Sequence, residues 1–230
     1  MSVSIEIVQD PAEACAELLL DVARRRGHAV MSGGSTPKRA YELAAAEPEA
    51  WRGAHVWFGD ERCVGPDDER SNYRMFKEAL LERIGDVAGA VVVHRIEGEL
   101  GPEAAAERYE TALRSAGPPP LDLLLLGIGP DGHTASLFPD QPTLDERDRL
   151  VVGVPMSGLE PFIPRVTLTL PAIASAQRIV FLVEGEGKAE IVARVFGAGV
   201  APTPHLPSTL VPSLSDRVTL LTDAAAASRL

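Results

Sequence analysis

Short apolar runs alternate along this chain with longer amphipathic stretches that are rich in alanine, glutamate and arginine. The run Leu121–Leu126 has five apolar residues in six, which is typical of a strand that is covered on both faces. Regular alternation of such strands with amphipathic helices is the pattern of βα units. The sequence therefore predicts an α/β fold, with helices flanking a mainly parallel sheet.

The elements and their connections predict a single domain over residues 1–230. No internal repeat or long linker occurs, and the proline cluster Pro118–Pro120 is interpreted as a rigid lead into the next strand. The expected strands are Val3–Val8, His28–Met31, His55–Phe58, Val91–Ile96, Leu121–Gly127, Leu150–Val154, Arg165–Leu170, Arg178–Val183 and Arg217–Leu221. The expected helices are Pro11–Arg26, Pro37–Ala46, Asn72–Ile84, Glu103–Ser115, Lys188–Phe196 and a short C-terminal piece.

Composition and charge argue against several classes of protein. Apolar residues make up 45% of the chain, which allows a large core, yet no apolar run is long enough to span a bilayer. The formal net charge of −11 argues against nucleic acid and anionic membranes as partners. Cys15 and Cys63 have no metal-ligand spacing and suit a reducing compartment. We therefore expect a cytoplasmic protein, and a phosphorylated substrate would need a local positive field at its site.

A glycine-rich segment follows the strand His28–Met31, and ligands of open parallel sheets bind at the carboxyl ends of the strands. Gly33 and Gly34 let the backbone approach a ligand closely. Ser35 or Thr36 is expected to cap the next helix, with Pro37 in its first position. Free N–H groups, hydroxyls and the helix dipole would then converge on a phosphate, although an ordinary capped turn has the same sequence features.

Charged residues follow two other strands. Arg62 is suited to clamp a phosphate or a carboxylate in a fork, and Asp60 to hydrogen-bond sugar hydroxyls or to orient Arg62. Lys188 stands at a helix start, where the helix dipole disfavours a cation unless an anion binds there. Taken alone, each of these residues is also compatible with a solvated surface.

His133 lies in the glycine-rich segment 127–136 after the strand Leu121–Gly127. Asp131, two residues earlier, can fix the tautomer of this imidazole or hold it in the charged form. The segment also matches the G-x-G-x-x-G pattern of dinucleotide-binding folds, but Pro130 stands where backbone donors are needed and no acidic residue ends the next strand. We expect the glycine loop, Arg62, His133 and Lys188 to meet at one edge of the sheet.

Several motifs resemble the 6-phosphogluconolactonases of the glucosamine-6-phosphate isomerase/6-phosphogluconolactonase family. They appear in the family's order over nearly the whole chain, and their combination is more specific than any one of them. The resemblance rests on Ser32–Pro37, Phe58–Val64 with Ser71–Tyr73, Leu121–Pro139, Pro164–Pro171 and Glu184–Lys188.

The resemblance implies a Rossmann-like fold and hydrolysis of 6-phospho-D-glucono-1,5-lactone in the oxidative pentose phosphate pathway, without a cofactor or a required metal. It implies that His133 is the base that activates water. Residues Gly33, Gly34, Ser35 and Thr36, together with Arg62, Arg165 and Lys188, would hold the substrate. The partner is then a small phosphorylated sugar lactone, and we expect a monomer or a weak dimer.

The lactone chemistry agrees with these residues. No G-x-S-x-G elbow occurs, which favours direct attack by water over an acyl-enzyme. The oxyanion can be met by backbone N–H groups of the glycine-rich turn or by Arg62, and the sequence does not choose between them. Two alternatives stay open: an amino-sugar-phosphate deaminase or isomerase with Asp60 as its base, and a sugar-phosphate sensor without catalysis.

Overall fold

A computed structural model describes residues 3–117 and 121–230, so the proline cluster Pro118–Pro120 lies outside the described residues. The main sheet has seven strands in the order β1-β10-β9-β6-β2-β3-β5, and all neighbouring strands are parallel. Its strands are β1 (Ser4–Ile7), β2 (His28–Met31), β3 (His55–Phe58), β5 (Val92–Val93), β6 (Leu123–Leu126), β9 (Ile179–Val183) and β10 (Val218–Thr222). The predicted α/β fold with a mainly parallel sheet is confirmed.

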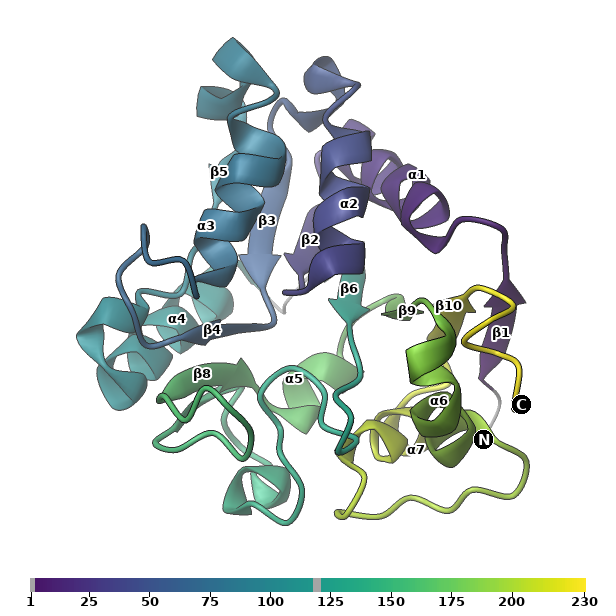
Figure 1. The fold of residues 1–230 in the computed structure, drawn as a ribbon. Helices are drawn as coiled ribbons and strands as arrows, with labels where there is room; N and C mark the ends of the chain where they lie inside the picture. The colour runs from purple at the N-terminus through teal and green to yellow at the C-terminus, as the bar shows by residue number, and fades with distance from the viewer. Residues whose placement is uncertain (1–2, 118–120) are drawn as a thin grey trace.

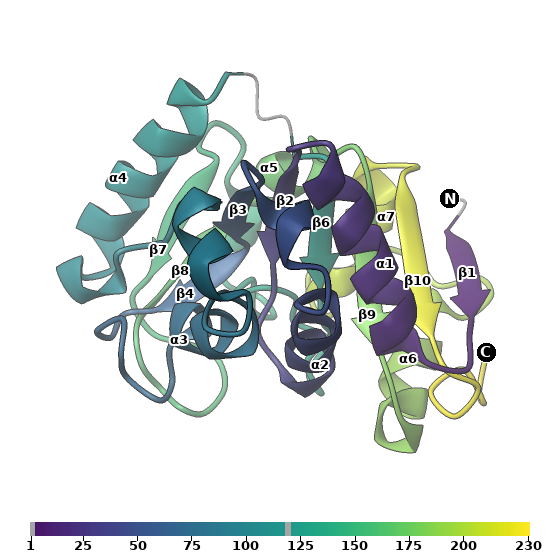
Figure 2. The same cartoon turned by 90° about the horizontal axis from the view of Figure 1, so that it is seen from above.

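Helices cover both faces of this sheet (Figures 1 and 2). In both views α1 and α2 lie on one side of the sheet, and α5 and α7 lie on the other. All four residues of β6 are buried leucines, as expected for a strand covered on both faces. The α-helices are α1 (Pro11–Arg24), α2 (Ser35–Ala44), α3 (Asn72–Phe76), α4 (Pro102–Ser115), α5 (Leu170–Ala174), α6 (Ala189–Phe196) and α7 (Val211–Leu214).

A second, three-stranded sheet stands beside the first and is antiparallel. It consists of β4 (Asp60–Arg62), β8 (Arg165–Leu168) and β7 (Val151–Val154), with α4 packed against β7 and β8. Two of its strands were predicted, but no strand was predicted at Asp60–Arg62. Leu170 was assigned to the strand Arg165–Leu170, whereas it starts α5. The second sheet matters for function because it pairs Asp60–Arg62 with Arg165–Thr167.

Short helical segments complete the chain and correct several predicted boundaries. The predicted helix Asn72–Ile84 is α3 followed by a π-helical turn at Lys77–Leu81, and the strand expected at Val91–Ile96 is only Val92–Val93. The expected short C-terminal helix is not formed, because residues 224–229 make turns. The 3₁₀ segments are Pro48–Trp51, Gly85–Ala90, Gly98–Leu100, Pro142–Asp145, Glu186–Lys188 and Pro207–Thr209.

Candidate active site

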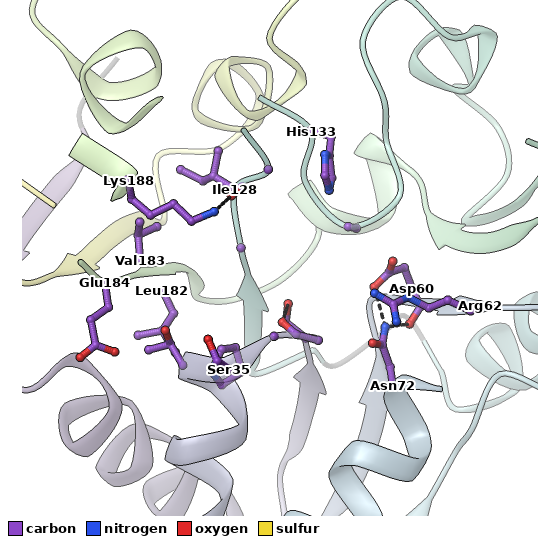
Figure 3. Close-up of a pocket in the computed structure, with 18 of the residues that line it drawn as sticks. Ser35, Asp60, Arg62, Asn72, Ile128, His133, Leu182, Val183, Glu184 and Lys188 are labelled. Atoms are coloured by element: carbon purple, nitrogen blue, oxygen red, sulfur yellow. Dashed lines mark hydrogen bonds between the residues drawn. The ribbon is translucent and has the colours of Figure 1, made fainter. Parts of the chain in front are cut away.

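One cavity of about 320 Å³ opens at the carboxyl ends of β2, β3, β6 and β9. These strands are neighbours in the sheet, so the loops that follow them meet at one edge, as Figure 3 shows. Every predicted site residue except Asp131 lines the cavity, and Asp131 contacts His133. The lining consists of Ser32–Pro37, Asp60, Arg62, Asn72, Gly127–Gly129, His133, Ala135, Arg165, Leu182–Glu184 and Lys188.

The glycine-rich loop brings the N-terminus of α2 to the cavity. Gly34 is the N-cap residue and has φ of +114°, a conformation that favours glycine. The helix thus begins at Ser35, and the expected cap by Ser35 or Thr36 with Pro37 in the first position is wrong. First-turn N–H groups have no acceptor within a helix, so those of Ser35 and Thr36 are available to an anion.

His133 and Asp131 form a close pair in the loop after β6. The Nδ1 atom of His133 lies 2.5 Å from Oδ1 of Asp131, and the side chains are 18% and 27% exposed. Burial opposes ionisation of Asp131, but its hydrogen bond and charge interaction with His133 outweigh burial and lower the pKa of the carboxyl group. A carboxylate only accepts hydrogen bonds, so in the neutral imidazole Nδ1 carries the proton and the free lone pair lies on Nε2.

Backbone packing and a distant serine fix this pair. A Cβ atom at Gly129 would collide with Nδ1 of His133 and with Oδ1 of Asp131. Ser208, which is fully buried, donates from its hydroxyl to the carbonyls of Gly132 (2.9 Å) and His133 (3.3 Å). Ser208 could not be predicted from the sequence, since a serine about 75 residues after the loop carries no pattern that links it to His133.

Arg62 and Arg165 face each other across the second sheet. They are directly opposed in the register of β4 and β8, an arrangement of like charges that is unfavourable in a sheet. Among the described residues neither forms a salt bridge, and the Nε atom of each is buried without a hydrogen-bond partner. Arg62 also donates from Nη1 to the carbonyl of Arg70 at 2.5 Å. Two guanidinium groups with unused donors therefore border the cavity, which is an arrangement that suits an anion.

Asp60 has different contacts from those expected. Its carboxylate is buried and accepts from the Ser136 hydroxyl at 2.6 Å and from Nδ2 of Asn72 at 3.1 Å. No hydrogen bond joins Asp60 to Arg62 in the described part of the chain, so Asp60 does not orient Arg62 through a direct hydrogen bond. Instead Asp60 ties together the loops after β3 and β6 and the start of α3.

Glu61 supplies the other link of this region to α3. Its buried carboxylate accepts from the backbone N–H groups of Arg62, Asn72 and Tyr73 and from the Ser71 hydroxyl. Asn72 and Ser136 lie within the motifs Ser71–Tyr73 and Leu121–Pro139, although neither was predicted to be a site residue.

Lys188 closes the cavity on the β9 side. It is the N-cap residue of α6, as expected for a lysine at a helix start, and its Nζ donates to the carbonyl of Ile128 at 2.7 Å (Figure 3). Burial lowers the pKa of Lys188, and the negative charge of Asp131 opposes that effect. The ammonium group is thus held beside the turn that carries His133, and two of its three donors remain for a ligand.

The other histidines lie outside the cavity lining. His28, His55 and His94 form a stack with Trp57, in which His94 lies 3.7 Å from Trp57 and His28 lies 4.2 Å from His55 between ring centroids. His205 pairs with Asp140 at the surface. Their contacts are consistent with the structural roles expected for them.

A histidine–aspartate pair beside three cations, at the edge of a mainly parallel sheet, defines a class of enzyme that acts on small anionic substrates. The family described as glucosamine-6-phosphate isomerases/6-phosphogluconolactonase matches residues 4–220, and the chain belongs to this family.

Known relatives agree with this assignment. The chain is 40% identical over 185 residues to a 6-phosphogluconolactonase of Synechocystis sp., covering 78% of this chain and 75% of that protein. It is 36% identical over 246 residues to one from Nostoc sp., covering 100% and 99%. The solved 6-phosphogluconolactonase of Trypanosoma brucei superposes with a TM-score of 0.81 at 27% identity, covering 100% and 99%. No helix among the described residues is long and apolar enough to cross a membrane.

Proposed function

We propose that this protein hydrolyses 6-phospho-D-glucono-1,5-lactone to 6-phospho-D-gluconate, the lactonase step of the oxidative pentose phosphate pathway, with His133 activating the attacking water. The observation that carries the proposal is the 2.5 Å pair of His133 and Asp131 in a cavity that also holds Arg62, Arg165 and Lys188. The 6-phosphogluconolactonases among the relatives, similar over most of the chain, support the same substrate.

The pair accounts for the proton transfers of ester hydrolysis. Nε2 of His133 takes a proton as the water oxygen bonds to the lactone carbonyl carbon, and the Asp131 carboxylate stabilises the imidazolium that forms. The resulting tetrahedral oxyanion collapses, the bond to the ring oxygen breaks, and His133 returns the proton to that oxygen. Base and carboxylate end the cycle as they began, so each turnover consumes one water molecule and no other reactant.

The cations are assigned to the charged and polar parts of the substrate. Arg62, Arg165, Lys188 and the first turn of α2 each present unused donors to the cavity. A phosphate bound among them relieves the repulsion between the two arginines. The local positive field of these cations in turn offsets the repulsion that the net charge of −11 exerts on an anionic substrate. Either Arg62 or the N–H groups of the glycine-rich turn then remain for the oxyanion.

The deaminase or isomerase alternative is disfavoured by the contacts of Asp60. That chemistry needs a free base at a substrate carbon, whereas both carboxylate oxygens of Asp60 already accept hydrogen bonds from Ser136 and Asn72.

We also propose that residues 1–230 act as one domain in the cytoplasm, as a monomer or weak dimer, which the acidic charge and the two unpaired cysteines support.

Turnover of two substrates tests the proposal. Freshly prepared 6-phosphogluconolactone should release acid faster with the protein than in a control without enzyme, since these lactones also hydrolyse spontaneously. Glucosamine-6-phosphate should release no ammonia. Ammonia release without lactone turnover would establish the deaminase alternative, and binding of both compounds without consumption would establish a sensor.

A further inference from the structure

Phe138 connects two groups of the cavity without lining it. The ring is fully buried, and its centroid lies 4.8 Å from that of the His133 imidazole. On the other side, the guanidinium carbon of Arg165 lies 5.4 Å from the same centroid. One aromatic side chain thus contacts both the proposed base and a proposed anion-binding group.

Arg165 has few other stabilising contacts. In the part of the chain that the structure describes, its side chain has no salt bridge and only one hydrogen bond, a long one of 3.5 Å from Nη2 to the carbonyl of Pro161. Burial lowers the pKa of Arg165, and the nearby charge of Asp60 opposes that effect. A partly desolvated guanidinium group in this position gains from the negative face of an aromatic ring.

The Phe138 ring is itself held from behind. A Cβ atom at Gly158 would lie 3.0 Å from Cβ of Phe138, so the loop between β7 and β8 packs directly on the aromatic side chain. The Ser157 hydroxyl stabilises this loop, because it lies 2.8 Å from the carbonyls of both Leu159 and Pro161 and shares its one proton between them. The ring therefore occupies a tight slot between the loop, His133 and Arg165.

We propose that Phe138 is a positioning residue of the active site. It holds the Arg165 guanidinium at the anion-binding position and fixes the placement of this group relative to the His133 imidazole. The inference rests on the proposed function, because Arg165 is assigned there to the substrate anion. Phe138 acts through these two neighbours and makes no contact with substrate.

Two phenylalanine substitutions distinguish an effect on the position of Arg165 from a general loss of protein stability. Phe138→Leu keeps an apolar side chain but removes the aromatic face. Phe181→Leu is the matched control, because Phe181 is also fully buried, packs on Phe196 with centroids 5.2 Å apart, and stands outside the cavity lining. Both variants should lose thermal stability to a similar degree, which a melting curve measures.

Only Phe138→Leu should change anion binding. We expect its Kd for inorganic phosphate and its KM for the lactone to rise about threefold to thirtyfold, the range of a cation–π contact in a partly desolvated site. In Phe181→Leu both quantities should stay at their wild-type values. If Phe138→Leu fails to fold, Phe138→Met serves in its place, since it fills the slot without an aromatic face.

A double-mutant cycle decides whether Phe138 acts through Arg165. In an Arg165→Met background, Phe138→Leu should weaken phosphate binding no further, because the group that it positions is gone. If Phe138→Leu weakens phosphate binding equally in the wild-type and Arg165→Met backgrounds, the inference is overturned. It is also overturned if Phe138→Leu keeps the wild-type phosphate affinity, if Phe181→Leu loses as much affinity, or if the wild-type protein binds no phosphate. Phosphate binding needs no turnover, so a failure of the proposed lactonase reaction is recognised separately, by phosphate binding without lactone hydrolysis.

Discussion

Replacing Gly129 with alanine should disable catalysis while leaving the fold in place. The added methyl group would collide with Nδ1 and Cε1 of His133 and with Oδ1 of Asp131. The imidazole must then move by roughly 1 Å, and a misplacement of that size costs about 100-fold in rate. The corresponding loss of transition-state stabilisation is about 2.7 kcal/mol.

The fold of this variant should be kept, because φ at Gly129 lies outside the positive range and the colliding atoms are the ends of the His133 and Asp131 side chains, not backbone. The assay is the initial rate of lactone hydrolysis above the spontaneous background, read beside a thermal melt and a phosphate titration. Gly89→Ala is the matched control, since a Cβ atom there meets nothing within 4 Å and Gly89 is not in the cavity lining. A Gly129→Ala protein with wild-type kcat would refute the claim that the turn sets the position of His133.

Three other predictions follow from the site and the core. Lys188→Ala should raise KM and leave kcat nearly unchanged, the pattern of lost ground-state binding, whereas a collapse of kcat at constant KM would place Lys188 on the transition state. Activity should survive exhaustive treatment with EDTA, because the described residues contain no group of three or more potential metal ligands, and loss followed by rescue with zinc would contradict this. Burial and the charges of His55 and His28 lower the pKa of His94 to about 4 from an ordinary 6.5, so the unfolded chain binds more protons between these values. The stabilisation that comes from this lowered pKa should therefore be fully present above pH 6.5. As the pH drops to 4, the free energy of unfolding should fall by about 1–2 kcal/mol, a range reduced because the ring is partly exposed. Urea melts at several pH values should show this loss in the wild type and less of it in His94→Gln.

The sequence predicted the main sheet and the edge at which the site lies. Strands such as His28–Met31 and His55–Phe58 have the predicted bounds, because each is an apolar run bounded by polar or glycine-rich turns. The convergence of four loops followed from the general geometry of parallel sheets. What each loop residue contacts could be anticipated only where partners are close in sequence, as with Asp131 and His133.

The second sheet and its consequences could not be predicted in this way. β4 is three charged residues, Asp60–Arg62, and becomes a strand only because β8, about 100 residues later, lies alongside it. Its antiparallel register opposes Arg62 to Arg165, and no periodicity in either segment reports that pairing. The contacts of Phe138 and Ser208 likewise depend on tertiary packing between segments whose sequences carry no mutual signal.

The replacement His133→Asn tests the central claim most directly, because it keeps a side chain of similar bulk with a hydrogen-bonding group and removes the basic nitrogen. If His133 takes the proton from water, kcat for the lactone should fall by about 10²–10⁴-fold above the spontaneous background. The affinity for inorganic phosphate should stay close to that of the wild type, since the cations of the cavity are untouched. A His133→Asn protein that hydrolyses the lactone at the wild-type rate would contradict the account.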